Sequence, residues 1–357
     1  MRHVIAALVA GLMAMPPAAC GGGDDEARKD SFTVGLLLPG RMLPRWEHSD
    51  KPVIENRLKI LCPHCAMEYA NAEDDATRQR QQMMSMITKG VRVLILDAAD
   101  TRALRSSIQE ANQAGVAVVA YDRLAEGPVS GYVSFDGAQI GRLQGEALLK
   151  AMGDRANSAD VVMMNGDPTS PNAAWFKRGA LSVMTGKVKI GRSYDTPGWS
   201  TENAHANMST AIAALGPDRI GGVLAANDGI AAGVISALKS ARVSELPPVT
   251  GQDADLDAVQ RIVKGEQYMT VYKAFRTEAA AAAAMAVALG RGEDLRDVAT
   301  TTTDSATTKH IPSLLLTPSA VTAGNIEQTL VKDGVYTIDQ ICTRQLRPAC
   351  DKAGLTR

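Results

Sequence analysis

Residues 91–123 read VRVLILDAADTRALRSSIQEANQAGVAVVAYDR, two short apolar runs on either side of an amphipathic stretch of helical length. The first run ends at Asp97, and the second ends at Asp122 and Arg123. An apolar strand, a helix and a second apolar strand in this order are typical of a parallel sheet covered by helices. This stretch therefore predicts an α/β fold with a mainly parallel sheet.

Three further apolar runs also stop at polar residues. GGVLAA ends at Asn227 and Asp228, PPVTGQ ends at Asp253, and YMTVY ends at Lys273. In an open α/β sheet the carboxyl ends of the strands line the ligand crevice, so we expect these side chains to converge on one cleft. Carboxylate, amide and cationic groups together suit a neutral polyhydroxylated ligand, because each hydroxyl both donates and accepts a hydrogen bond.

The number of expected strands indicates two lobes. Strands are expected at 32–38, 66–71, 91–97, 116–121, 131–134, 159–165, 187–192, 220–226, 246–251 and 268–272. One doubly wound sheet rarely takes so many strands, and 357 residues exceed what one hydrophobic core usually supports. We therefore predict two Rossmann-like lobes with parallel sheets, joined by a hinge of three chain crossings.

The expected division of the chain follows from this pattern. We expect a signal peptide at 1–19, a lipid-anchored flexible tether at 20–31, a first lobe at 32–134 plus 273–309, a second lobe at 135–272 plus 310–342, and a tail at 343–357. A helix from Gln139 to Met152 starts the second lobe. An alanine-rich helix at 275–289 is expected to end at Gly290, because glycine commonly terminates helices.

The N-terminus is typical of an exported protein. Met1-Arg2-His3 is followed by an apolar stretch from Val4 to Met15, too short to span a bilayer as a stable helix. Small residues then lead into Cys20 and a glycine-rich segment, which resembles the lipobox of bacterial lipoproteins, although Pro17 departs from it. We expect Cys20 to be acylated and to hold the protein at the outer face of the cytoplasmic membrane. The alternative is that Cys20 is incidental to an ordinary cleavage site.

Four further cysteines are Cys62, Cys65, Cys342 and Cys350, an even number in an exported chain. Local bridges Cys62–Cys65 and Cys342–Cys350 are the simplest pairing, and the other pairings stay open. CPHC at 62–65 also resembles the dithiol of a thiol oxidoreductase. That chemistry needs the first cysteine at a helix N-terminus, whereas these cysteines follow an expected helix, so a structural bridge is favoured.

Several other classes of function lack their signals. Net charge is −1 and the charges are dispersed, so no nucleic-acid partner is expected. The sequence shows no catalytic motif, and we expect no enzyme, no cofactor and no metal. Asp253-Ala254-Asp255-Leu256-Asp257 resembles the start of a calcium loop, but Ala258 and Lys264 stand where glycine and glutamate are needed. Asp255 is instead expected to cap the next helix.

A series of short segments, in this order, carries a specific resemblance. They are RW at 45–46, AYDR at 120–123, SFD at 134–136, TENA at 201–204, AAND at 225–228, TGQDAD at 250–255 and MTVYK at 269–273. With them the chain, from about residue 32 to about 342, resembles the periplasmic sugar-binding proteins of ABC importers, most closely the D-xylose-binding branch. The resemblance implies the type I periplasmic-binding-protein fold and a monomer that closes around one monosaccharide and delivers it to a membrane permease.

The resemblance also implies a role for individual residues. Sugar hydroxyls would be bound by Asp122 and Arg123 from the first lobe, by Asn172, Asn227 and Asp253 from the second lobe, and by Lys273 at a crossing, with Trp46 and Trp199 covering the sugar ring and Arg45 completing the site. Asp97 and Asp228 also follow strands, but residues at such positions often cap helices or form turns.

One segment departs from the D-xylose-binding pattern. Residues 165–179 read NGDPTSPNAAWFKRG, where Ser170 and Pro171 replace two polar residues and Lys177 replaces an arginine, while Asn172 is kept. We therefore expect D-xylose or a related aldose as the ligand.

Three other functions compete with transport. A sugar-sensing receptor module would use the same site. A thiol-disulfide oxidoreductase would use Cys62 and Cys65. A regulator of the lac-repressor type shares the two lobes, but the secretory N-terminus and the absence of a helix-turn-helix motif exclude it.

Overall fold

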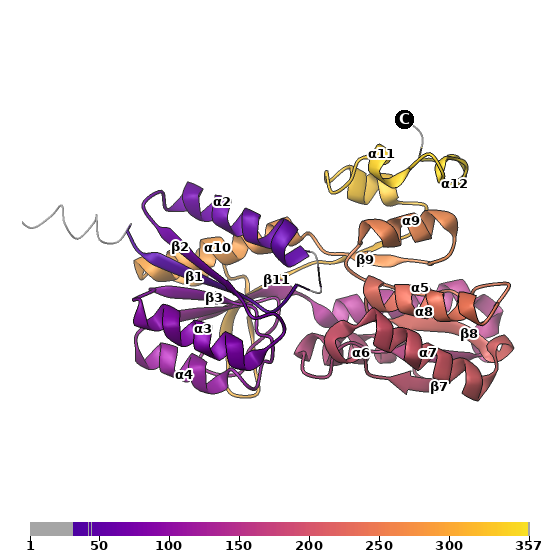
Figure 1. Cartoon of the computed structure of the whole chain (residues 1–357), viewed down its shortest axis with the longest axis horizontal. Helices are drawn as coiled ribbons and strands as arrows, with labels where there is room; N and C mark the ends of the chain where they lie inside the picture. The colour runs from indigo at the N-terminus through magenta and orange to yellow at the C-terminus, as the bar shows by residue number, and fades with distance from the viewer. Residues whose placement is uncertain (1–30, 42, 44, 356–357) are drawn as a thin grey trace, which may run out of the picture.

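The computed structural model describes residues 31–41, 43 and 45–355. The expected signal peptide, Cys20 and nearly all of the expected tether lie outside the described residues. The remainder forms two lobes side by side along the long axis of the molecule (Figure 1). The predicted α/β class is confirmed.

The first lobe is built on a seven-stranded sheet with the order β10-β11-β5-β4-β3-β1-β2. All neighbouring strands are parallel except β10 and β11. The strands are β1 (Thr33–Leu38), β2 (Ala66–Asn71), β3 (Val93–Leu96), β4 (Ala117–Tyr121), β5 (Gly131–Phe135), β10 (Thr301–Thr303) and β11 (Ile311–Leu316). β3 and β5 are buried throughout and β4 at every residue except Ala117, as their continuous apolar runs require of a sheet covered on both faces.

Helices on both faces of this sheet belong to the same lobe (Figure 1). They are α2 (Lys51–Leu61), α3 (Ala76–Thr88), α4 (Arg105–Gln113) and α10 (Phe275–Arg291). The alanine-rich α10 does not end at Gly290 as expected. Gly290 lies inside the helix, where a Cβ would be 2.3 Å from the ring of Phe32, and Gly292 ends the helix with a φ of 74°. A left-handed backbone conformation, rather than glycine itself, marks the end of this helix.

The second lobe has a three-stranded parallel sheet with the order β7-β6-β8. Its strands are β6 (Asp160–Met164), β7 (Lys189–Tyr194) and β8 (Ile220–Ala225), and its helices are α5 (Gly137–Met152), α6 (Pro171–Met184), α7 (Thr201–Leu215), α8 (Asp228–Ser240) and α9 (Leu256–Lys264). The strand expected at 246–251 is reduced to one parallel bridge, between Val223 and Val249.

Glycines let α5 and α6 approach closely. A Cβ on Gly141 would lie 2.0 Å from the carbonyl oxygen of Phe176, and a Cβ on Gly179 would lie 2.1 Å from that of Ala138. Only glycine fits at both positions. The contact fixes α6, whose first turn carries Asn172, against the helix that follows the first crossing.

The chain crosses between the lobes after β5, after β9 (Thr270–Tyr272) and between β11 and β12 (Ser319–Val321). β9 and β12 form a two-stranded antiparallel sheet. The lobe boundary expected at 309/310 is displaced, because β11 pairs with β5 and so completes the first sheet. The last crossing therefore follows Leu316.

Two disulfides join Cys62 to Cys65 and Cys342 to Cys350. The first lies between the C-terminal end of α2 and the start of β2, as predicted. The dipole at that end of a helix does not favour a thiolate, which argues for a structural bridge.

The C-terminal residues do not form the separate tail that was expected from residue 343. Short helices α11 (Ile338–Ile341) and α12 (Arg347–Lys352) lie over α9 (Figure 1). Leu346, Cys350 and Leu355 are buried in one cluster with residues of α9, so hydrophobic burial holds this segment on the second lobe.

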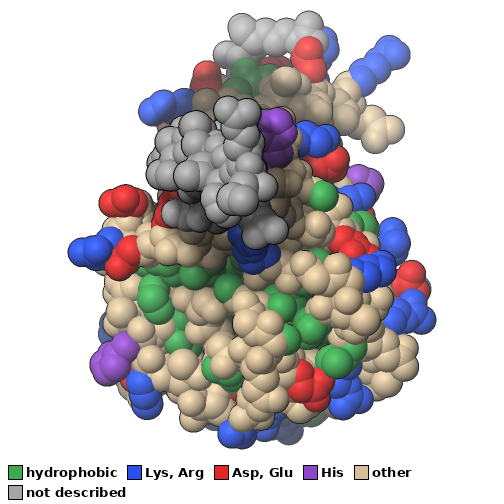
Figure 2. Space-filling view, turned by 90° about the vertical axis from the view of Figure 1, so that its left-hand side faces the viewer, with side chains coloured by type: hydrophobic (Ala, Val, Ile, Leu, Met, Phe, Trp, Pro, Cys, Tyr) green, Lys and Arg blue, Asp and Glu red, His purple; other side chains and the backbone are tan. Residues whose placement is uncertain are grey.

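Among the described residues, no helix is both long and apolar enough to cross a bilayer. Figure 2 shows the end of the first lobe, where Lys and Arg side chains are interspersed with Asp and Glu.

Candidate functional site

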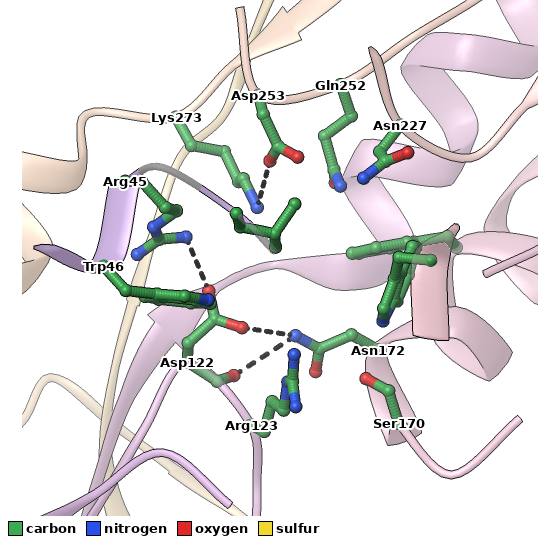
Figure 3. A pocket seen from close by; sticks show the side chains of 13 residues that line it. Arg45, Trp46, Asp122, Arg123, Ser170, Asn172, Asn227, Gln252, Asp253 and Lys273 are labelled. Atoms are coloured by element: carbon green, nitrogen blue, oxygen red, sulfur yellow. Dashed lines mark hydrogen bonds and ion pairs between the residues drawn. The ribbon is translucent and has the colours of Figure 1, made fainter. Parts of the chain in front are cut away.

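A small cavity lies between the lobes. It is lined by Leu43, Arg45, Trp46, Asp122, Arg123, Ser170, Asn172, Phe176, Trp199, Asn227, Gln252, Asp253 and Lys273. All nine residues predicted to contact a ligand are among them, and their role as ligand contacts stays a prediction. Figure 3 shows the labelled side chains around this space.

Asp122 follows β4 and has a left-handed backbone with a φ of 56°. Its carbonyl oxygen accepts hydrogen bonds from the hydroxyls of Tyr132 (3.1 Å) and Ser134 (2.8 Å), which lie on the neighbouring strand β5. Burial would raise the pKa of the carboxyl group, but Arg45, Lys273 and Arg123 together hold it below the ordinary value. Asp122 is therefore a fixed carboxylate at the cavity wall.

Arg45 is surrounded by three carboxylates. Its Nε and Nη1 donate to Asp50 and Asp122, each at 2.9 Å, and its Nη2 donates to Glu278 at 2.7 Å. The guanidinium lies 3.6 Å from the centre of the ring of Phe275. Burial raises the pKa of Glu278, although Arg45 opposes this shift. With its donors engaged in this way, Arg45 orients Asp122 as well as lining the cavity.

Arg123 is held in place by the two residues that follow β3, Asp97 and Ala98. Its Nη1 donates to the carbonyl oxygen of Ala98 at 3.0 Å, and its Nε lies 3.5 Å from Oδ1 of Asp97. Burial raises the pKa of Asp97, despite the opposing charge of Arg123. Asp97 does not line the cavity, so this strand-end residue supports Arg123 instead of facing the space.

The second lobe contributes amides and a hydroxyl. The Nδ2 of Asn172 donates across the lobes to Oδ1 of Asp122 at 2.9 Å. Three of the residues that line the cavity have a buried side-chain oxygen without a hydrogen-bond partner in the described chain: Oδ1 of Asn172, Oγ of Ser170 and Oε1 of Gln252. Buried polar atoms are normally paired, so these three are available to the hydroxyls of a small ligand.

Asn227 both caps a helix and lines the cavity. Its Oδ1 accepts from the backbone N–H of Ile230 at 2.9 Å, which makes it the N-cap of α8. The amide nitrogen is therefore the group left to face the cavity, where it lies next to Gln252 (Figure 3). The cap expected from Asp228 is thus supplied by Asn227, and Asp228 does not line the cavity.

Lys273 and Asp253 form an ion pair at the hinge side of the cavity. The Nζ of Lys273 lies 2.9 Å from Oδ1 of Asp253, and both side chains are nearly buried. Asp253 has a φ of 99°, outside the range that residues with a Cβ usually adopt. Asp255 stands immediately before α9, but its side chain forms no capping hydrogen bond, contrary to expectation.

Two indole rings border the cavity, one from each lobe. Trp46 begins a π-helical turn (Trp46–Asp50). Trp199 lies in a short 3₁₀ turn with a φ of 55°, and its ring centre is 6.3 Å from that of Phe176. A Cβ on Gly166 would lie 2.0 Å from the Trp199 ring, so the absence of a side chain at residue 166 makes room for the indole.

Four lining residues were not predicted as ligand contacts: Leu43, Ser170, Phe176 and Gln252. Gln252 could have been found, because it is the polar end of the run PPVTGQ and directly precedes Asp253. Of the departures noted in the sequence, Ser170 lines the cavity and Lys177 does not. Pro171 occupies the first turn of α6, where its missing N–H is tolerated.

The sequence matches a family of known proteins. A family model described as a periplasmic binding protein domain covers residues 44–294. The chain is 34% identical over 316 residues to the D-xylose-binding periplasmic protein of Escherichia coli (strain K12), an alignment that covers 87% of this chain and 92% of that protein. It is 33% identical over 332 residues to the multiple sugar-binding periplasmic receptor ChvE of Rhizobium radiobacter, covering 87% and 93% of the two chains.

Solved structures agree with these similarities. The structure of an ABC transporter solute binding protein from Clostridium phytofermentans with bound β-D-glucose superposes with a TM-score of 0.80 at 31% identity. The match covers 87% of this chain and 99% of that one. These relatives are named as binding proteins and a receptor, and none of them as an enzyme.

Proposed function

The chain belongs to the periplasmic sugar-binding proteins of ABC transporters, and on this premise we propose that it binds one molecule of D-xylose, or of a related aldose, between its lobes. The sugar is then delivered to a permease of the ABC type. The name of the relative from Escherichia coli favours D-xylose.

The observation that carries this proposal is the composition of the interlobe cavity. Carboxylates of Asp122 and Asp253, the cations of Arg123 and Lys273, and the amide of Asn172 surround one small space. A sugar hydroxyl donates to a carboxylate and accepts from a cation or an amide, so this set matches both functions of the ligand. The apolar faces of a pyranose ring would lie against indole rings.

Closure of the lobes would couple binding to delivery. Asp122 and Arg123 belong to the first lobe, whereas Asn172 and Asn227 belong to the second lobe. A sugar that bonds to both sets has more partners when the lobes are closed, and it shifts the equilibrium toward the closed form by that difference in affinity. A permease that recognises the closed form would then accept only loaded protein.

The location at the membrane surface is a separate part of the proposal. Its basis is the short apolar N-terminal stretch and the lipobox-like sequence before Cys20. Acylation of Cys20 would keep the binding protein near its permease. Cell fractionation tests this point: the wild-type protein is expected in the membrane fraction and a Cys20→Ser variant in the soluble fraction. Equal solubility of the two proteins would contradict it.

A sensory role is a second candidate, because one relative is named a receptor for multiple sugars. Both roles use the same cavity and the same closure. Uptake of radiolabelled sugar by cells that lack the gene distinguishes them: transport predicts lost uptake, whereas a purely sensory role predicts normal uptake.

A thermal-shift screen tests the proposed ligand class. The panel contains D-xylose, arabinose, ribose, glucose, galactose and a purine nucleoside. A ligand at about 1,000 times its Kd stabilises the folded protein by about 4 kcal/mol, which raises Tm by several degrees. We expect this rise with D-xylose and none with the nucleoside. The proposal would be contradicted if only the nucleoside raised Tm, or if no sugar of the panel raised it.

A further inference from the structure

The loop that carries Asp253 has a backbone that residues with a Cβ rarely adopt. Asp253 has a φ of 99° and Ala254 a φ of 55°. Such conformations persist only when the surrounding structure holds them. The direction of the Asp253 carboxylate, and with it the ion pair to Lys273, therefore depends on what holds this loop.

The second lobe itself supplies part of the support. Three consecutive N–H groups of the loop donate to fixed acceptors: Asp253 to the carbonyl oxygen of Val271 (2.9 Å), Ala254 to Oγ1 of Thr270 (3.1 Å), and Asp255 to Oδ2 of Asp228 (3.0 Å). Thr270 also donates its hydroxyl hydrogen to Asp228 at 2.9 Å. Asp228 does not line the cavity, but its carboxylate fixes the loop through Asp255 and Thr270.

The remaining support comes from the far end of the chain. The hydroxyl of Tyr336 donates to the carbonyl oxygen of Ala254 at 3.0 Å. Tyr336 directly precedes Thr337, the N-cap of α11, which forms a reciprocal capping box with Gln340. The carbonyl oxygen of Gln340 in turn accepts from the side chain of Gln260 on α9, at 3.1 Å. Tyr336 is therefore held at its hydroxyl by Ala254, and the helix that follows it is held by α9.

Hydrophobic packing joins the same two parts of the molecule. We call residues 335–355 the C-terminal cap. Ala254 is 1% exposed and belongs to one buried cluster with residues of this cap: Ile341, Leu346, Cys350 and Leu355. The disulfide between Cys342 and Cys350 closes the cap upon itself. Figure 1 shows the cap lying over α9, at the side of the second lobe.

We infer that the C-terminal cap is a positioning element of the ligand site: Tyr336 holds the carbonyl group of Ala254, and this fixes the carboxylate of Asp253 beside Lys273. The inference rests on the proposed function, because it takes Asp253 as a ligand contact. None of residues 335–355 lines the cavity. Its effect on affinity passes through the backbone of residues 253 and 254.

The first experiment is a double-mutant cycle on D-xylose affinity. Tyr336→Phe removes one hydroxyl and keeps the ring, so we expect a loss of about 3- to 10-fold in affinity, the value of one hydrogen bond. In an Asp253→Asn background the same substitution should have no further effect, because the group it positions is already changed. The inference would be overturned if the double variant lost affinity by the product of the two single losses, or if Tyr336→Phe alone lost none.

A matched control is Tyr194→Phe, which changes a partly buried tyrosine at the edge strand β7 of the same lobe. It should leave the affinity for D-xylose unchanged. An equal loss in both tyrosine variants would mean that the loss reflects general loosening of the lobe, and this would also overturn the inference.

The two disulfides provide a second comparison. A Cys342→Ser/Cys350→Ser variant should lose about 3- to 10-fold in affinity, whereas Cys62→Ser/Cys65→Ser, in the other lobe, should retain the wild-type affinity. Equal affinities in the two double variants would count against a positioning role. If the first variant does not fold, the tyrosine cycle still decides.

Failure of the proposed function is a separate outcome. If the wild-type protein binds neither D-xylose nor another sugar of the panel, the proposed function fails before any variant is compared. If the wild-type protein binds D-xylose and Tyr336→Phe binds it equally well, only the inference about the cap fails.

Discussion

Asn172 and Asp122 connect the two lobes directly across the cavity. The Nδ2 of Asn172 lies 2.9 Å from Oδ1 of Asp122 and 3.3 Å from its carbonyl oxygen. Asn172 stands in the first turn of α6, and Asp122 follows β4 of the other sheet. Because the acceptor is an ionised carboxylate, this bond belongs to the stronger class of hydrogen bonds.

The first prediction concerns this interlobe bond. Asn172→Ala removes both the bond to Asp122 and the buried Oδ1, which has no partner in the described chain. We expect a 10- to 100-fold loss of D-xylose affinity, about 1.5–3 kcal/mol, as for a hydrogen bond to a charged group. Calorimetry measures the loss. Asn112→Ala, at an exposed position of α4, is the control and should bind normally. Normal binding by Asn172→Ala would contradict the assigned role.

The second prediction concerns Ser170, the departure that lines the cavity. Its Oγ is buried without a partner in the described chain, so it is available to one sugar hydroxyl. Ser170→Ala should lower affinity about 3- to 10-fold for the preferred sugar, and less for an epimer that lacks the matching hydroxyl. Ser182→Ala, at an exposed position of α6, the helix that follows Ser170, should have no effect. The same loss for every sugar would show that Ser170 has no part in specificity.

The third prediction tests Trp199 without removing it. Gly166→Ala places a methyl group where a Cβ would be 2.0 Å from the indole, so the ring must move. We expect at least a 10-fold loss of affinity, since the packing of a sugar ring against the indole depends on contact distance. Gly324→Ala is the control, because a Cβ there meets nothing within 4 Å. Unchanged binding by Gly166→Ala would exclude Trp199 as one wall of the site.

The fourth prediction is a pH dependence of stability. Burial and the nearby charge of Asp253 raise the pKa of Asp255 to about 7. In the unfolded chain the pKa is about 3.9. Between these values the folded protein binds more protons than the unfolded chain, so stability falls as pH rises and the loss is complete above the folded pKa.

Melting temperatures at pH 5 and pH 8 test this dependence. Asp255→Asn should reduce the fall between these pH values by about 2 kcal/mol, or a few degrees in Tm. Part of the fall should remain, because burial also raises the pKa of Asp228, which keeps its carboxyl group. An identical pH profile in Asp255→Asn and wild type would contradict the raised pKa.

Much of the site could be predicted because parallel strands bring their carboxyl ends to one edge. Asp122, Asn227 and Asp253 were recognisable as polar residues at the ends of apolar runs. Whether a strand-end residue faces the cavity was not predictable from the run alone. The carboxylate of Asp97 pairs with Arg123, and that of Asp228 accepts a hydrogen bond from the backbone N–H of Asp255. Each partner is distant in sequence, so the apolar run alone does not indicate it.

The remaining differences also come from contacts between distant segments. Glu278 reaches Arg45 across 233 positions, and no local pattern indicates that pairing. β11 joins the first sheet because it pairs with β5, about 180 residues earlier. The C-terminal cap has short, polar-rich helices, and only its burial against α9 distinguishes it from a loose tail.

A calorimetric titration of the purified protein with D-xylose tests the central claim most directly. We expect saturable one-to-one binding with a Kd on the order of micromolar, about 8 kcal/mol, and much weaker binding of the sugar by Asn172→Ala. Absence of binding by D-xylose and by every other sugar of the panel would contradict the claim that the interlobe cavity is a monosaccharide site.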